Sequence, residues 1–332
     1  METLRMGLVV PLLILGCSAA GSGPAGGAES GTAESTGGAS GSTSPGGSAS
    51  VGQAGQAGEG GDTGAGTPPL DAGPKTPSPP APGEWISVNQ GSYLAGAAPD
   101  DTCNTSVNQV EHPVTLTHDF ELSATEVTFA QYELAMGAPH PSAGSCPSCP
   151  ANLLSWHAAA ALCNAYSTSA GLVPCYACDG AVCEEAIAPH ACHGYRLPTE
   201  AEWEFAHRAG TSAPTYAGAI TVCGGLDPGL DGIAWFLYNS SGGAHPVGTK
   251  QANAWGFFDM SGNVWEWTHD GYVSDRSTLP QLDPVGPASD LRVMRGGSYN
   301  CVPSEIRAAH RSGLPATIAG LNVGVRCART LD

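Results

Sequence analysis

The chain has few basic residues and no long apolar run, and both shortages limit what it can do. Its 332 residues include 12 Lys and Arg against 30 Asp and Glu, a formal net charge of -18. So acidic a chain is not expected to take nucleic acid or an anionic lipid surface as its main partner. The apolar run from Leu8 to Leu15 is far too short to span a bilayer.

The first 17 residues have the pattern of an export signal. Arg5 precedes the apolar run, and a small residue stands before Cys17. The segment Ile14-Leu15-Gly16-Cys17 resembles the lipobox of bacterial lipoproteins, which are cleaved before the cysteine and lipidated on its sulfur. The resemblance implies a lipidated Cys17, with an ordinary cleaved signal peptide as the alternative. Because Ser18 follows, rather than an aspartate, we expect an exported protein anchored in the bacterial outer membrane.

Residues 18–83 consist almost entirely of Gly, Ser, Ala, Thr and Pro. Such a segment buries too little apolar surface to offset its ordering entropy, so we predict a disordered linker. Treated as a Gly-rich coil, it has a root-mean-square reach of roughly 45 Å. The remaining residues, 84–332, are enough for one large domain with a core of its own.

Eleven of the twelve cysteines lie in the predicted domain. In an exported domain this density favours disulfides, and the odd number predicts one thiol that is free or pairs between chains. The Cys-x-x-Cys pairs at 146–149 and 175–178, with His190 and His193 nearby, could instead be zinc-binding hooks. An oxidising compartment makes disulfides the preferred interpretation. Five cysteines fall within 175–223, which predicts a loop insertion stapled by disulfides.

Three helices are predicted from capping residues and apolar spacing. One begins at Thr125, with Thr125, Glu126 and Thr128 as candidate capping residues. A second covers 155–171 with Ser155 as its N-cap. In the third, Thr199 caps the helix and Glu202 stands three residues later as the capping-box partner. After residue 210 the helix signal ends, so short strands and loops are expected there.

Four motifs occur in the order typical of the formylglycine-generating enzyme, or sulfatase-modifying factor, family: "GYRLPTEAEWEFAHRAG" (194–210), "NAWGFFDMSGNVWEWTHD" (253–270), "RVMRGGSYN" (292–300) and "NVGVRCAR" (322–329). Residues 111–133 and 152–166 also resemble the family's opening segments. The resemblance covers nearly all of residues 84–332. It implies an α+β, C-type-lectin-like fold of the formylglycine-generating-enzyme type, with a small twisted antiparallel sheet and little regular secondary structure.

Active members of that family bind copper(I) through two cysteines five positions apart and oxidise a substrate cysteine to formylglycine. Cys301, after Ser298 and Tyr299, matches the first cysteine, but Ile306 stands in the second place. The resemblance also implies that Trp265 lines the active-site cleft. Since two thiolates hold the ion, loss of one should abolish tight copper(I) binding.

Two alternatives remain for Cys301. Another cysteine of the stapled insertion could approach it, or Cys301 could form a disulfide with Cys103, which is the commoner fate of an exported cysteine. The resemblance further implies a disulfide between Cys163 and Cys327. In the chain-entropy model, closing so long a loop stabilises the fold by roughly 4 to 5 kcal/mol.

The segment "DMSGNVWE" resembles the family's calcium-binding motif. The implied ligands are the side chains of Asp259 and Glu266 and the carbonyls of Gly262 and Val264; the family has asparagine in the first place. Hard cations such as calcium take several oxygen ligands, and aspartate is an acceptable substitute. The alternative is a loop whose acids bond backbone amides. Residues 231–243 are short of the acidic ligand segment of the family's second site, so one calcium is expected.

Four arginines form a basic cluster that is unusual in so acidic a chain. We expect them to form ion pairs in the core with the glutamates of the two central motifs. The arginines are Arg295, Arg307, Arg311 and Arg326, and the glutamates are Glu200, Glu202, Glu204 and Glu266.

The leading hypothesis is an exported lipoprotein whose domain has lost or altered the copper oxidase activity. Such a domain would bind a protein or glycan ligand at the cell surface. The alternative is an active copper-dependent oxidase that converts a cysteine of exported sulfatases to formylglycine, with Cys301 as its catalytic thiol. Related non-haem-iron oxygenases need a separate His-rich helical domain. The ten histidines here are scattered, with no helical His-x-x-x-His pair, so that class is not favoured.

Overall fold

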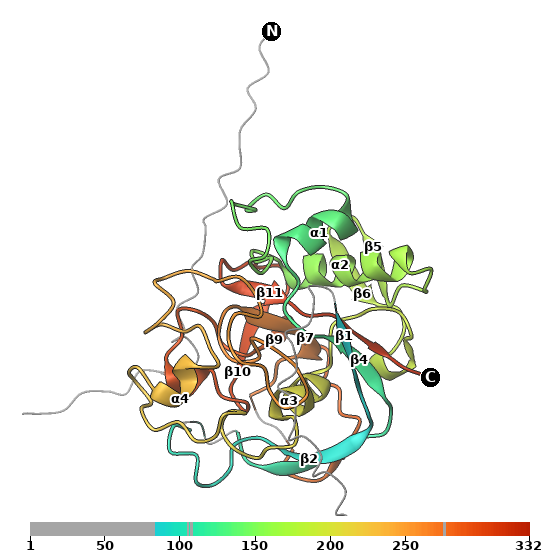
Figure 1. Ribbon diagram of the computed structural model, residues 1–332. Helices are drawn as coiled ribbons and strands as arrows, with labels where there is room; N and C mark the ends of the chain where they lie inside the picture. Colours follow the sequence, from blue (N-terminus) through green and yellow to red (C-terminus); the bar gives the residue numbers. More distant parts are fainter. Residues whose placement is uncertain (1–83, 105, 107–108, 275–276) are drawn as a thin grey trace, which may run out of the picture. The chain divides into compact units, whose positions relative to one another are not determined.

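The computed structural model describes residues 84–332 apart from 105, 107–108 and 275–276 (Figure 1). The predicted signal segment with Cys17 and the predicted linker, residues 1–83, lie outside the described residues. Within the described part, no helix is both long and apolar enough to cross a membrane.

The described strands form four sheets. The central one has the order β10 (Arg311–Pro315), β9 (Leu291–Arg295), β7 (Trp265–Gly271), β11 (Val323–Val325). Two three-stranded sheets are β1 (Trp85–Val88), β4 (Phe120–Ser123), β12 (Ala328–Thr330), and β2 (Gly91–Ala95), β3 (His112–Leu116), β8 (Gln281–Leu282). The fourth is the hairpin β5 (Tyr176–Asp179), β6 (Val182–Glu185).

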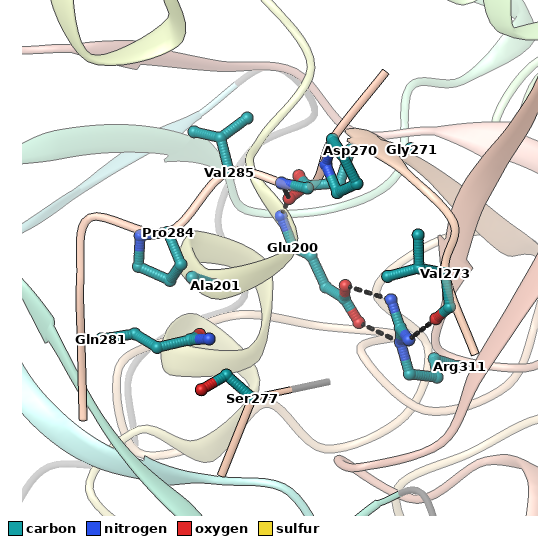
Figure 2. Close-up of a pocket in the computed structure, with 12 residues that line it drawn as sticks. Glu200, Ala201, Asp270, Gly271, Val273, Ser277, Gln281, Pro284, Val285 and Arg311 are labelled. Atoms are coloured by element: carbon teal, nitrogen blue, oxygen red, sulfur yellow. Dashed lines mark hydrogen bonds and ion pairs between the residues drawn. The ribbon is translucent and has the colours of Figure 1, made fainter. Parts of the chain in front are cut away.

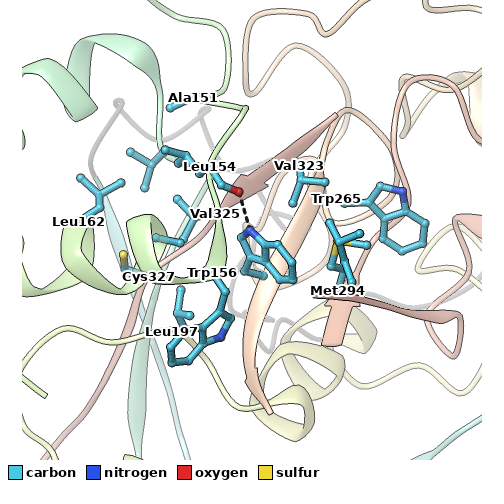
Figure 3. Packing of buried hydrophobic residues seen from close by; sticks show 14 of the residues in the cluster. Ala151, Leu154, Trp156, Leu162, Leu197, Trp265, Met294, Val323, Val325 and Cys327 are labelled. Carbon is cyan, nitrogen blue, oxygen red and sulfur yellow. Dashed lines mark hydrogen bonds between the residues drawn. The ribbon is translucent and has the colours of Figure 1, made fainter. Parts of the chain in front are cut away.

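Most strand pairs are antiparallel, as expected, but β7 pairs with β11 and β3 with β8 in parallel. Every residue of β7 is buried, so this strand runs through the interior of the domain (Figure 1). Buried aromatic side chains surround it. The Trp267 indole donates a hydrogen bond to the Leu154 carbonyl at 2.8 Å, which ties β7 to the segment before the longest helix (Figure 3).

The helices are α1 (Phe129–Met136), α2 (Trp156–Ser169), α3 (Glu200–Arg208) and the short α4 (Pro228–Asp231), with 3-10 turns η1 (Pro189–Ala191) and η2 (Pro303–Glu305). Ser155 caps α2, and Thr199 and Glu202 form the capping box of α3, as predicted. Both signals are local, so sequence alone was sufficient to find them.

The predicted helix start at Thr125 is wrong. The helix begins at Phe129, and of the expected capping residues Thr128 is the N-cap, with Gln131 completing the capping box. Val127 is held outside the helix, since its N–H donates to the Val325 carbonyl at 2.9 Å and its carbonyl accepts from the Ala151 N–H. Tertiary backbone hydrogen bonds therefore outweigh the local capping signal.

Five disulfides join ten of the described cysteines: Cys103–Cys223, Cys146–Cys149, Cys163–Cys327, Cys175–Cys192 and Cys178–Cys183. The Cys163–Cys327 bridge is the one that the resemblance implies, and two bridges staple the insertion. Both Cys-x-x-Cys pairs are in disulfides and not in zinc hooks. The predicted Cys103–Cys301 pairing is wrong, because Cys103 pairs with Cys223. Cys301 is itself disulfide-bonded, so the described part holds no free cysteine and the prediction of a free thiol is wrong too.

Candidate functional site

Cys301 lies in a tight turn after β9. Gly296 and Gly297 have positive φ angles of 90° and 72°, a backbone that favours glycine and turns the chain sharply. The Ser298 N–H donates to the Cys301 sulfur at 3.2 Å, and the Ser298 hydroxyl lies 3.3 Å from it. Asn322 donates to the Ser298 hydroxyl at 3.0 Å. The sequence-predicted pair Cys301 and Ser298 is therefore in direct contact.

Ile306, which stands in the place of the second copper-binding cysteine, lies in the apolar core. Ile306 is fully buried, and a Cβ atom built on Gly297 would lie 2.5 Å from its Cγ2. Every other cysteine of the described part is committed to a disulfide, so none of the insertion's cysteines supplies a second thiolate to Cys301. The hypothesis that an insertion cysteine completes the site is therefore wrong.

Trp265, the third predicted site residue, begins β7. Its N–H donates to the Asn322 carbonyl at 2.8 Å, and Asn322 in turn bonds Ser298, so the three predicted residues share one neighbourhood. Its ring packs with Met294 and Val323 (Figure 3) and lies 5.8 Å from the ring of His310. Burial, with help from nearby arginines, lowers the pKa of His310 to about 3, so this ring is neutral. Sequence reasoning assigned no role to Asn322, although it is the first residue of the motif at 322–329.

The predicted calcium ligands lie in a buried acidic cluster that also contains Glu126. One oxygen of Asp259, Oδ2, accepts from the Gly248 N–H at 2.7 Å, whereas Oδ1 is buried and has no hydrogen-bond partner among the described residues. Glu266 is paired with Arg326 at 2.8 Å and accepts from the Trp203 indole at 2.6 Å. The two predicted carboxylates are therefore not equally available to a cation.

Glu126 was assigned to a helix cap from the sequence, but the structure buries it completely. It accepts hydrogen bonds from the Asn263 side chain at 2.8 Å and the Val264 N–H at 3.1 Å. Burial and the neighbouring carboxylates of Asp259 and Glu266 raise its pKa well above the usual range.

Three carboxylates, of Glu126, Asp259 and Glu266, thus share the single guanidinium of Arg326. Burial raises the pKa of Asp259 to about 6, although the Gly248 N–H and Arg326 oppose the shift. The excess negative charge and the unpartnered Asp259 oxygen fit a cation such as calcium, whereas the carboxylate of Glu266 is committed to Arg326 and Trp203. Calcium at the four predicted ligands together stays a prediction.

The predicted arginine–glutamate pairs are present in part. Arg326 binds Glu266, Arg311 binds Glu200 with two bonds of 2.8 Å, and Arg295 binds Glu204 at 2.6 Å. Two expected partners differ: Arg307 pairs with Asp101 at 2.7 Å, and Glu202 pairs with Arg196 at 2.7 Å.

A cavity of 180 Å³ lies beside the start of α3 and the end of β7 (Figure 2). Its charged groups are satisfied: Glu200 binds Arg311, and Asp270 accepts from the N–H groups of Glu200 at 2.7 Å and Gly286 at 2.5 Å. The cavity therefore offers no uncompensated charge to a ligand. Sequence reasoning did not find it, because its walls come from separate parts of the chain.

Residues 72–331 match the sulfatase-modifying factor enzyme 1-like domain, so the chain belongs to this family. Its α+β fold is the C-type-lectin-like fold of formylglycine-generating enzymes, as predicted. Treponema denticola variable protein 1 is similar in structure, with a TM-score of 0.62 and 26% identity over 74% of this chain and 95% of that one. PvdO of Pseudomonas aeruginosa shares the fold, with a TM-score of 0.59 and 23% identity over 75% of this chain and 95% of that one.

Among curated proteins, the formylglycine-generating enzyme of Mycobacterium tuberculosis is 38% identical over 164 residues, which are 43% of this chain and 54% of that protein. The chain spans about half the length of the curated formylglycine-generating enzymes it matches. The chaperone protein LppX of Paenibacillus barcinonensis is 27% identical over 245 residues, 64% of this chain and 80% of that protein.

Proposed function

We propose that this chain is a surface binding module and not a copper oxidase. The carrying observation is the second copper position, because Ile306 there is a fully buried core residue. Every cysteine of the described part, Cys301 included, is disulfide-bonded, so none is free to act as a thiolate ligand. A two-thiolate copper(I) site needs a second soft ligand of that kind.

The ligand is a protein or a glycan at the cell surface, and a polypeptide is the better supported of the two. One relative that aligns over most of its own length is named a chaperone protein. The formylglycine-generating enzymes, whose family acts on cysteine-containing sulfatase segments, are 38% and 36% identical to this chain over 164 and 151 residues.

The proposal extends to the cellular location of the domain. The lipobox at Cys17 would anchor the exported chain in the bacterial outer membrane, and residues 18–83 would hold the domain away from the lipid surface. One calcium ion near Asp259 would be structural. The strong negative charge makes nucleic acid an unsuitable partner.

The decisive experiment compares binding with turnover on one substrate. A labelled Cys-x-Pro-x-Arg peptide is incubated with the purified chain, copper(I) and oxygen, and the product mass is measured. Fluorescence anisotropy of the same peptide reports binding without copper. An active formylglycine-generating enzyme is the positive control, and Cys301→Ser is the matched variant.

We expect no mass change with the wild-type chain, and anisotropy that is the same for wild type and Cys301→Ser. Conversion to formylglycine that disappears in Cys301→Ser would overturn the proposal in favour of the oxidase alternative. If neither binding nor conversion occurs, an immobilised glycan array tests the second ligand class with the same labelled protein.

A further inference from the structure

Two histidines and one carboxylate meet at a place that the site above does not include. His118 lies between β3 and β4, His190 lies in η1, and Glu202 is the third residue of α3. The Nε2 atom of His118 is 2.9 Å from Oε1 of Glu202 and 3.1 Å from Nδ1 of His190. All three of these side chains place a potential ligand atom within 4.8 Å of one another.

The hydrogen-bond partners determine where the protons lie. The Asp283 carbonyl, 3.1 Å from His190 Nε2, can only accept, so His190 carries its proton on Nε2 and presents a lone pair at Nδ1. The Glu202 carboxylate also only accepts, so His118 carries its proton on Nε2. That one hydrogen then faces two acceptors, Glu202 and His190.

The other ring nitrogen of His118, Nδ1, is buried with its hydrogen-bonding capacity unsatisfied by the described residues. Oδ1 of Asp283 nevertheless lies 3.2 Å away from it. If the His118 proton moves to Nδ1, that atom can donate toward the Asp283 carboxylate. The lone pairs of His118 Nε2 and His190 Nδ1 and the Glu202 carboxylate oxygen then converge without a hydrogen between them, which is an arrangement that a cation satisfies.

The geometry points to a binding site for a divalent transition-metal ion, such as zinc, formed by His118, His190 and Glu202. Tetrahedral zinc with bonds of about 2.0–2.1 Å separates its ligand atoms by about 3.3 Å, close to the 2.9 and 3.1 Å between these atoms in the structure. Asp283 supplies an acceptor to the outer nitrogen of each ring, as carboxylates and carbonyls do for metal-bound histidines.

Charge and access agree with this assignment. Burial lowers the pKa of His190, so the ring is in the neutral form that a metal needs. Burial alone would raise the pKa of Glu202, but Arg196 and the hydrogen bonds from His118 and Thr199 hold it low, so Glu202 is a carboxylate. The His118 side chain is 12% exposed, which leaves a route for the ion and a water ligand.

Arg196 sets the limit on affinity. It donates to both oxygens of Glu202, at 2.7 and 2.8 Å, and so fixes the carboxylate while its charge opposes a nearby cation. Two imidazole ligands favour zinc or copper(II) over calcium, which prefers oxygen. The site is therefore chemically separate from the acidic cluster around Asp259.

The first test is calorimetric titration of the chelator-treated chain with zinc chloride in the presence of excess calcium chloride. We expect one zinc per chain, with affinity reduced at least about tenfold in His118→Ala and in His190→Ala. His193→Ala is the matched control, because the His193 side chain is 54% exposed and lies outside the cluster, and its affinity should be unchanged. No binding by the wild type, or equal binding by all variants, overturns the proposal.

A second measurement uses the wild-type chain and does not depend on the folding of any variant. Long-range ¹H–¹⁵N correlation spectra of histidine-labelled protein distinguish the two ring tautomers. Zinc should move the proton of His118 from Nε2 to Nδ1 and shift the ligating nitrogens of His118 and His190. Spectra in which no histidine changes on zinc addition would refute the site.

Discussion

Two buried carboxylate sites in this domain behave in opposite ways. Glu202 has a guanidinium of its own in Arg196, and its pKa is held low in spite of burial. In the second site, Glu266 binds Arg326 directly, and Glu126 and Asp259 have no other guanidinium near them among the described residues. The pKa values of Glu126 and Asp259 are both raised. Burial is common to both sites, so the number of cations per carboxylate decides the ionisation state. The first site has a balanced carboxylate, and the second has a surplus of negative charge that a proton or a cation can neutralise.

The largest expected effect comes from removing the guanidinium of Arg326, which is the one that the described residues supply to the second site. Arg326→Met leaves Glu266 buried without its charge partner and should lower the free energy of unfolding by about 3–5 kcal/mol. Urea denaturation at neutral pH measures the change. Arg329→Met is the control: its ion pair with Glu121 is partly exposed, with side-chain exposures of 28% and 18%, and its loss should cost about 1 kcal/mol or less. Equal losses in the two variants would show that Arg326 does not hold the cluster together.

The next effect is the pH dependence of the free energy of unfolding that Asp259 causes. Because the folded pKa of Asp259, about 6, exceeds the unfolded value near 3.9, the folded state binds the proton more tightly. The stability from this group is therefore fully present below about pH 4 and is lost as pH rises through 6, by at most about 3 kcal/mol. Asp259→Asn keeps an acceptor for the Gly248 N–H and has no charge to lose.

We therefore expect Asp259→Asn to be more stable than wild type at pH 7 in calcium-free buffer, with a flatter stability profile between pH 4 and 7. Denaturation midpoints across that range provide the measurement. A variant whose profile runs parallel to that of the wild type would place the titrating group elsewhere.

The smallest effect is stabilisation by calcium, which tests whether a proton or a cation neutralises the acidic cluster around Asp259. Calcium at 100 times its dissociation constant should raise the free energy of unfolding by about 2.7 kcal/mol at neutral pH, and a chelator should reverse this. Asp259→Ala should lose the stabilisation, whereas His118→Ala should keep it, since the histidine cluster favours a different ion. Thermal unfolding of the three proteins with and without calcium measures the shift. An unchanged wild type would leave protonation as the way the cluster is neutralised.

Local signals in the sequence predicted part of the structure well. The Thr199 and Glu202 capping box and the Ser155 cap depend on neighbours within one helical turn, so they could be found without the fold. The helix start at Thr125 failed, because Val127 forms backbone hydrogen bonds with Ala151 and Val325. A capping pattern cannot anticipate partners so distant in the chain.

The sequence by itself determined the family, the fold class and the absence of a second copper-binding cysteine, because each depends only on residue identity and order. Only the tertiary structure decided that Cys103 pairs with Cys223, that Glu126 joins Asp259, and that His118 and His190 meet Glu202. Disulfide geometry, buried charge and metal-ligand spacing all depend on distances of a few ångströms between residues far apart in the chain. Those distances are set by the packing of sheets, turns and loops, which no single segment contains.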